Sequence, residues 1–482
     1  MSHFRLVSMK RIFIKYALTL CMAFVAILTA SAGSVQFDEG DFTYTVTDAV
    51  NFECEVASYN DHAAEVVVPS TVTYKGKTLT VVSIGESAFE DNEEIIKVIL
   101  PNTVKEIGKL AFHNCKSLST VDMLAVKTIR YKAFESCTSL SNIKMPAVET
   151  IDDDAFLGCT SLSYIDVFAV KDDIFIGGNN TEIYGGVKNI GEYAFAGCKS
   201  LKEIEIPQSV KTIGSNAFSG VELKKLIIRS SEQELDISSS SEYGSSFNGC
   251  SCDYFFLGRN FKGSKYEPTE IPKGLIITNK ITIGSLVDKL AFIETPTFKN
   301  FKINYGESPC IIPSDYLFGT APNDTVYFER NCKGDNSFYF AKEANTNVVV
   351  IGNYISRFTV EFEPQNEINS LILGKKLGHI YDISATIKVI YSYNPTPPSI
   401  GRINKNNYIN TVVYVPKGSL EAYQTADIWK NFWEIKEMET SGIENTSIET
   451  QRDDAVYNLS GQRLEKPQKG INIIKGKKIY VK

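Results

Sequence analysis

The segment Ala133–Ile143 reads A-F-E-S-C-T-S-L-S-N-I, and the pattern within it decides the fold. Its opening pair, alanine followed by phenylalanine, recurs at six places between residues 81 and 230. The pairs are Ala88-Phe89, Ala111-Phe112, Ala133-Phe134, Ala155-Phe156, Ala194-Phe195 and Ala217-Phe218. Their steps are 23, 22, 22, 39 and 23 residues, and the long step holds an insertion rich in glycine and asparagine at residues 172–186. Such a period predicts a solenoid, a stack of similar turns.

Apolar residues keep phase with these pairs. An isoleucine lies four residues before each alanine, and other apolar residues follow the phenylalanine after six, nine and eleven residues in most repeats. This alternation predicts a strand with one buried face, which stacked turns about 4.8 Å apart would pool into a common core. The Ala-Phe segment would form a short turn or helix on the far wall. We therefore expect a mainly β solenoid with a period of 22–23 residues.

Four cysteines occupy one position of the repeat, three residues after the phenylalanine. They are Cys115, Cys137, Cys159 and Cys198. Zinc would require closely spaced cysteine pairs, which these repeats lack. Disulfides between adjacent turns are conceivable from the spacing, but side chains that point the same way have poor disulfide geometry. We interpret these residues as buried free thiols that act as small apolar side chains.

The motif A-F-x-x-C-x-S-L-x-x-I resembles the BspA-type leucine-rich repeats of bacterial surface proteins. It is intact at Ala133–Ile143, Ala155–Ile165 and Ala194–Ile204, and at Ala111–Val121 with valine in the last place. The resemblance implies a leucine-rich-repeat solenoid with caps at both ends. It also implies a surface protein that works in adhesion rather than in catalysis.

The first 32 residues have the features of a secretory signal peptide. Basic residues precede the apolar run Ala17–Ala30, and Ala30-Ser31-Ala32 matches a cleavage site. Met9 is an alternative start, because the residues after it form a complete basic segment. The apolar run is shorter than the roughly 20 residues that span a bilayer, and no later segment is long and apolar enough. We expect an exported protein, at the cell surface or outer membrane or secreted, without a transmembrane segment in its mature chain.

Composition shifts divide the chain into six parts. Lys75-Gly76 predicts a hairpin turn ahead of the repeats, where a solenoid needs a cap. After residue 230 the phase loosens, which indicates irregular repeats or, as the alternative, a separate β domain. The expected parts are a signal peptide (1–32), an N-terminal β cap (33–80), regular repeats (81–230), irregular repeats (231–400), a C-terminal capping unit (401–439), and a linker with a small β tail (440–482).

The C-terminal part holds both tryptophans of the chain, Trp429 and Trp433. A strand that ends at Pro416 and a short helix from Ser419, a favourable N-cap residue, would precede them. The two interpretations are a cap that closes the last repeat and an aromatic binding patch. The stretch resembles the closing unit of BspA-type proteins, which favours the cap.

The last residues contain two expected hairpins, with turns near Ser460-Gly461 and Lys475-Gly476. Their sequence resembles the end of the C-terminal sorting domains that a type IX secretion machinery recognises in Gram-negative anaerobes. The resemblance covers only about the last 30 residues, and it implies delivery to the cell surface.

Catalytic and cofactor motifs are missing from the sequence. It contains no H-E-x-x-H, G-x-S-x-G or phosphate-binding loop, and only four histidines. We predict that the protein is not an enzyme and binds no cofactor or metal. The alternative is an enzyme whose catalytic site lies in residues 231–400. The net charge of −7 argues against nucleic acid as a partner, because nucleic-acid binders need a basic surface.

The exposed face of the repeat strands is the remaining candidate for binding. Its residues alternate with the core positions, and aromatic and apolar groups among charges suit a protein-binding patch. The predicted ligand-binding residues are Lys97, Asp122, Lys144, Tyr164, Asp166, Phe168, Glu203, Glu205 and Lys225. The competing interpretation is an ordinary solvated sheet face.

These observations predict a surface protein that binds protein ligands of host or neighbouring cells without catalysis. The alternative is a glycan-capturing component of a nutrient-uptake system.

Overall fold

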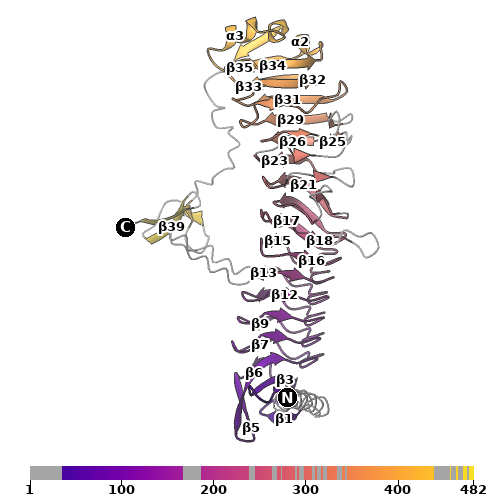
Figure 1. Ribbon diagram of the computed structural model, residues 1–482, viewed down its shortest axis with the longest axis vertical. Helices are drawn as coiled ribbons and strands as arrows, with labels where there is room; N and C mark the ends of the chain where they lie inside the picture. Colours follow the sequence, from indigo (N-terminus) through magenta and orange to yellow (C-terminus); the bar gives the residue numbers. More distant parts are fainter. Residues whose placement is uncertain are drawn as a thin grey trace, which may run out of the picture.

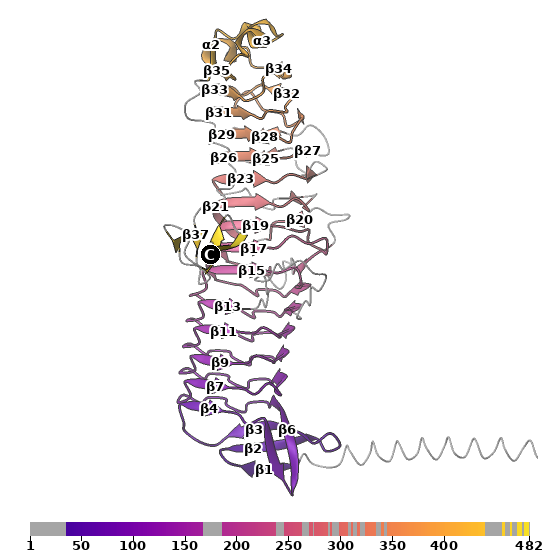
Figure 2. The same cartoon turned by 90° about the vertical axis from the view of Figure 1, so that its left-hand side faces the viewer.

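In the computed structural model, the described residues between 35 and 438 form an elongated stack of short strands (Figures 1 and 2). The structure describes residues 35–166, 186–237, 245–262, 269–272, 274–287, 290–291, 298–306, 310–311, 316–318, 323–333, 339–341, 345–438, 456–457, 463–464, 470–474 and 477–481. The predicted signal peptide lies outside the described residues.

Antiparallel strands precede the first turn. They are β1 (Gln36–Glu39), β2 (Phe42–Asp48), β3 (Glu53–Tyr59), β5 (Thr71–Tyr74) and β6 (Lys77–Ile84). β5 and β6 form the hairpin predicted at Lys75-Gly76, and both turn residues have positive φ. β3 pairs with β6 in parallel, so these strands continue into the first wall of the solenoid.

Two parallel walls run through the regular repeats. The first continues from β6 through β8 (Glu106–Ile107), β10 (Thr128–Ile129), β12 (Thr150–Ile151), β14 (Asn189–Ile190), β16 (Thr212–Ile213) and β18 (Asp236–Ile237). The second comprises β4 (Glu65–Val67), β7 (Lys97–Ile99), β9 (Thr120–Asp122), β11 (Asn142–Lys144) and β13 (Tyr164–Asp166). The repeats up to β13 each contribute one short strand to each wall.

A second long ladder of parallel strands carries the solenoid to its C-terminal end. It comprises β15 (Glu203–Ile206), β17 (Glu222–Ile228), β19 (Ser251–Leu257), β21 (Ile276–Ile283), β23 (Asn300–Ile303), β26 (Asn323–Phe328), β29 (Asn345–Ile351), β31 (Glu367–Leu373), β33 (Thr386–Ser392), β35 (Val412–Val415) and β36 (Glu434–Glu437). In Figure 2 these strands continue the stack above β7 to β13. The prediction of a mainly β solenoid is confirmed.

The turns of this C-terminal half also contain shorter strands, which pair in parallel from one turn to the next. They are β20 (Thr269–Glu270) with β22 (Leu290–Ala291), β24 (Cys310–Ile311) with β27 (Cys332–Lys333), β25 (Tyr316–Phe318) with β28 (Tyr339–Ala341), and β30 (Arg357–Phe358), β32 (His379–Ile383) and β34 (Ser399–Ile403) in one sheet. The tail forms a separate antiparallel sheet of β37 (Val456–Tyr457), β38 (Arg463–Leu464), β39 (Gly470–Ile474) and β40 (Lys477–Val481). Both predicted tail hairpins are present.

The phenylalanines of the Ala-Phe pairs stack into one column inside the solenoid. Neighbouring ring centroids lie 4.8 to 5.6 Å apart, with interplanar angles of 13° or less. The column runs through the six phenylalanines of these pairs, Phe89, Phe112, Phe134, Phe156, Phe195 and Phe218, and continues to Phe247, which follows a serine; all seven are buried. Each ring therefore buries both faces against the turns before and after it.

The Ala-Phe segments are turns rather than helices, and they form a third ladder. The Phe112 amide donates to the Ala133 carbonyl at 2.8 Å, and the same bond recurs in the neighbouring turns. Residues on either side of each pair have positive φ, from Ser87 and Asp91 to Asn216 and Gly220. Left-handed residues at both ends bend the chain sharply, which explains a turn where a helix was the alternative.

The C-terminal end is closed by α2 (Asn407–Asn410), α3 (Leu420–Thr425) and a 3-10 turn, η1 (Trp429–Asn431). Trp429 is fully buried, and its indole N–H donates to the Pro398 carbonyl at 2.7 Å. Trp433 is 77% exposed. Trp429 therefore packs inside the C-terminal end of the stack, whereas Trp433 lies on its surface. Ser419 precedes α3 as predicted, but its side chain makes no capping hydrogen bond, because its backbone is already helical.

Replacing Phe134 with alanine should lower the free energy of unfolding by about 3–5 kcal/mol, because a fully buried large side chain is lost. Chemical denaturation of the two proteins measures the difference. Ile96→Ala is the matched control, since Ile96 is 50% exposed and should cost far less. Equal midpoints for Phe134→Ala and the unchanged protein would contradict the stacked column.

Candidate binding surface

On the strand face predicted to bind ligands, side chains form rows that cross β4, β7, β9 and β11. Lys97 lies beside Glu65 on one side and Thr120 on the other, and Asp122 lies beside both Ile99 and Lys144. Asp122 and Lys144 are exposed, whereas Lys97 is half-buried. The Lys97 ammonium is 2.9 Å from the Glu65 carboxylate, which raises the pKa of Lys97. Lys97 is thus committed to an ion pair, and Asp122 and Lys144 are the more available charges.

Two predicted residues can be placed by their backbone alone, and a third cannot be placed. The backbone of Tyr164 and Asp166 lies in β13, in register with Asn142 and Lys144. Phe168 lies outside the described residues. Within the described chain, β13 ends one sheet and β15 begins another.

The other three predicted residues, Glu203, Glu205 and Lys225, belong to this second sheet. Glu203 pairs in register with Lys225, and Glu205 forms an ion pair with Arg229. The eight predicted residues that the structure describes therefore lie in two sheets. Whether they bind a ligand stays a prediction.

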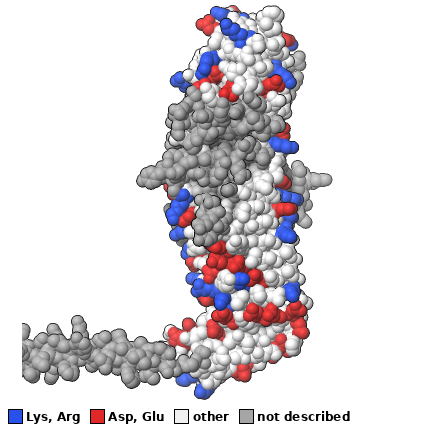
Figure 3. Space-filling view, turned by 90° about the vertical axis from the view of Figure 1, so that its right-hand side faces the viewer, with Lys and Arg blue, Asp and Glu red and all other residues white. Residues whose placement is uncertain are grey.

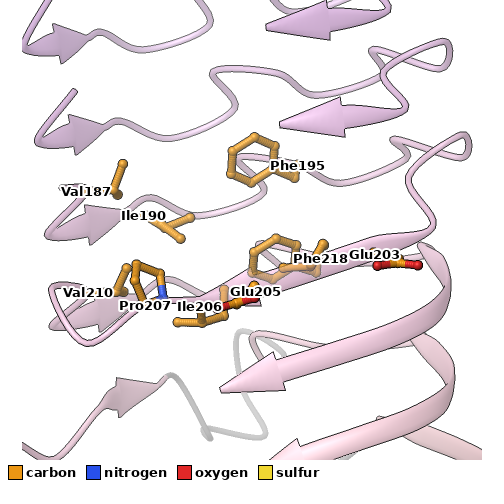
Figure 4. Close-up of a pocket in the computed structure, with 10 residues that line it drawn as sticks. Val187, Ile190, Phe195, Glu203, Glu205, Ile206, Pro207, Val210 and Phe218 are labelled. Atoms are coloured by element: carbon orange, nitrogen blue, oxygen red, sulfur yellow. The ribbon is translucent and has the colours of Figure 1, made fainter. Parts of the chain in front are cut away.

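A small cavity lies behind β15, between consecutive turns (Figure 4). Phe195 and Phe218 lie one above the other on one side of it, and Val187, Ile190 and Val210 line the other. Its volume is about 30 Å³, which accommodates one water molecule rather than a substrate. This cavity is therefore no candidate binding site for a substrate.

Apolar side chains are exposed on the N-terminal part of this wall. Val67 in β4 is 61% exposed, and Leu124, which follows β9, is 60% exposed. Val67 begins the cross-strand row that continues through Ile99 to Asp122 and Lys144, and Leu124 lies two residues beyond Asp122. Exposed apolar groups bordered by charges are typical of the centre and rim of a protein interface.

Charged side chains gather at the N-terminal end of the side shown in Figure 3, where acidic residues lie over the turns with basic residues among them. Ion pairs join neighbouring turns, including Lys109 to Glu86 at 3.0 Å and Arg130 to Glu106 at 2.8 Å. Exposed pairs of this kind contribute little stability, so the core holds the turns together.

Sequence reasoning missed the outer face of β19 to β35, because the register of the irregular repeats could not be assigned. Tyr254, Tyr327, Tyr391 and Tyr414 are half-buried there, and Tyr391 stacks on Tyr414 with ring centroids 5.1 Å apart. The detectable signal was the alternation within each strand, for example Tyr254 and Phe256 on either side of buried Phe255.

A family model of the BspA type leucine rich repeat region matches residues 70–180 and 169–252, with six copies. These residues are a BspA-type leucine-rich-repeat region. The repeat resemblance is thereby confirmed. Among curated proteins, none matches the chain.

Solved leucine-rich-repeat structures resemble the chain at low identity. The pneumococcal vaccine antigen PcpA is 16% identical with a TM-score of 0.36, over 85% of this chain and 100% of that one. A leucine-rich repeat protein from Bacteroides ovatus is 18% identical with a TM-score of 0.32, over 84% and 100%. A leucine rich cell surface protein from Faecalibacterium prausnitzii is 17% identical with a TM-score of 0.31, over 85% and 97%.

The cysteines of the leucine-rich repeats are free and buried, as predicted. The Cys137 thiol donates to the Phe112 carbonyl of the preceding turn at 3.0 Å, and the other repeat cysteines make the equivalent bond. Burial raises the pKa of Cys115 and of Cys198 to about 12. Their thiolates are scarce at neutral pH, so they are poor nucleophiles and poor metal ligands.

Among the described residues, no group of three or more histidine, cysteine or acidic side chains is placed to hold a metal ion. No helix in that part of the chain has the length and apolar character to cross a membrane.

The repeat thiols should resist alkylation in the native protein, because a raised pKa keeps them protonated until the pH approaches that value. Iodoacetamide at pH 8 should leave peptides containing Cys115, Cys137, Cys159 and Cys198 unmodified, and guanidinium should expose all four. Peptide mass spectrometry measures both states. A Lys116→Cys variant, exposed beside Cys115, is the positive control. Rapid native labelling, or disulfide-linked peptides, would refute the buried-thiol interpretation.

Proposed function

We propose that this leucine-rich-repeat protein is displayed on the cell surface and binds protein ligands of host or neighbouring cells without catalysis. The observation that carries the proposal is the exposed face of β4, β7, β9 and β11, where the apolar side chains of Val67 and Leu124 share one surface with Asp122 and Lys144. Parallel strands hold these side chains at fixed spacing, so little ordering of the surface is needed on binding. Repeat solenoids commonly use such extended faces for recognition.

Export rests on both ends of the sequence. The signal-like segment 1–32 predicts passage across the inner membrane, and the tail motif predicts recognition by a type IX sorting system. Both belong to the proposal. Delivery to the surface is what would bring the strand face into contact with other cells.

The binding face is tested with the purified full chain, fluorescently labelled, on cultured host cells. Replacing Asp122, Leu124 and Lys144 with alanine should weaken saturable binding at least tenfold, because central interface residues carry most of the binding energy. Glu86→Ala/Lys109→Ala removes an exposed ion pair elsewhere and should bind normally. Trypsin treatment of the cells should abolish binding to a protein ligand. Unchanged affinity of the triple variant would reject this face.

Surface display is tested by protease shaving of intact source cells. Tryptic peptides from residues 81–230 should appear in the medium before lysis. As the control, the same protease is added to lysed cells, which shows whether it can cleave the folded repeats at all. Release only after lysis would place the protein inside the envelope and remove adhesion as its function.

A further inference from the structure

A second surface, distant from the N-terminal face, combines tyrosines with lysines. Tyr305 follows β23 and Tyr354 follows β29, and their ring centroids lie 4.9 Å apart. Tyr305 is 50% exposed and Tyr354 is 60% exposed. An exposed pair of aromatic rings offers a flat apolar platform, and most soluble surfaces keep such groups apart.

Three lysines each place their ammonium group over a tyrosine ring of this surface. Lys302 lies 5.0 Å from the ring centroid of Tyr327, which is directly opposite it in the sheet. The other two pairs are Lys280 over Tyr254 at 5.8 Å and Lys376 over Tyr354 at 6.0 Å. Cation–π contacts of this kind orient a lysine while leaving its charge uncompensated.

These lysines differ from the paired lysines of the N-terminal turns. There, Lys97, Lys109 and Lys116 each lie within 3.0 Å of a glutamate. None of the three lysines over tyrosines forms an ion pair with a carboxylate of the described residues. The pKa of Lys280 is lowered, first by burial and then by the charge of Lys302, which fits a locally positive surface.

One carboxylate of this region lies beside a tyrosine rather than beside a lysine. The pKa of Tyr327 is raised, first by burial and then by the neighbouring Glu329 carboxylate. One Glu329 oxygen is buried, and Glu329 forms no ion pair with any of the three lysines within the described residues.

The spacing of the positive charges indicates the kind of ligand. From β19 to β31 there are five consecutive strand steps, a length of about 24 Å at about 4.8 Å per step. Three lysines over that length correspond to roughly one positive charge every 8 Å. A nucleic-acid strand presents a charge about every 3.4 Å, so this surface is too sparsely basic for it. An acidic peptide offers no rigid rings for the exposed tyrosines.

We propose that this tyrosine–lysine strip binds an acidic polysaccharide that lies along the solenoid axis. The strip consists of Tyr254, Lys280, Lys302, Tyr305, Tyr327, Tyr354 and Lys376. The apolar faces of sugar rings pack on Tyr305 and Tyr354, while Lys302 and Lys376 pair with carboxylate or sulfate groups. The inference does not rest on the proposed protein-binding face, because it uses other residues and another class of ligand.

The test measures binding of the purified full chain to polygalacturonate, chondroitin sulfate, neutral dextran, polyglutamate and single-stranded poly(dT) by isothermal titration calorimetry. Saturable binding to at least one acidic polysaccharide, at least tenfold tighter than to dextran, polyglutamate and poly(dT), is expected. Absence of binding to both acidic polysaccharides would overturn the proposal. Equal affinity for polyglutamate or poly(dT) would also overturn it, since charge alone would then explain the binding.

Variants assign the binding to the strip. Lys302→Ala/Lys376→Ala should weaken it at least tenfold at low salt, and the difference should shrink at high salt as charges are screened. Tyr305→Ala/Tyr354→Ala should weaken it at both salt concentrations. Lys109→Ala/Lys116→Ala, which removes two paired lysines, is the matched control and should bind normally. Equal binding by all variants, at unchanged melting temperature, would place the site elsewhere.

The two proposals fail separately. The Asp122, Leu124 and Lys144 triple variant should retain full polysaccharide binding, and the tyrosine variant should retain trypsin-sensitive cell binding. Loss of both activities in either variant would show that one surface serves both ligands, and the second site would be rejected.

Discussion

Stacking of one phenylalanine per turn is the interaction on which the rest of the structure depends. Rings about 5 Å apart match the spacing of hydrogen-bonded parallel strands, so the aromatic column and the β ladders reinforce one repeat distance. A turn alone could not bury its phenylalanine, because both faces of the ring need a neighbour. The thiol of each repeat cysteine donates to the carbonyl of the preceding turn's phenylalanine, which fastens the column to the backbone.

This internal order leaves the outer faces free to differ along the molecule. In the N-terminal turns most lysines pair with acids of the neighbouring turn, and the exposed strand face mixes Val67 and Leu124 with charges. Farther along, tyrosines replace the acids as neighbours of lysine. One scaffold thus supports two chemically distinct surfaces, and each can change without disturbing the core, because only the alternate, inward residues hold the turns together.

Much of the fold could be predicted where the repeat is regular. The isoleucine before each Ala-Phe pair is buried in a short strand, and the repeat cysteines are buried and free. The predicted binding residues were harder to judge. Lys97 and Glu205 occupy the expected strands but are engaged in ion pairs. Partners that lie one turn away in space are about 22 residues away in sequence, and no local pattern reports them.

The sequence by itself determined the repeat period, the inward and outward positions of the regular strands, and the absence of recognised catalytic motifs. These follow from alternation and spacing, which are local properties of the chain. Only the tertiary structure decided that Trp429 closes the solenoid while Trp433 is exposed, and that Tyr305 meets Tyr354. The physical reason is that stacking brings residues of different turns into contact, and in the irregular repeats the register that aligns them is set by packing rather than by a repeated motif.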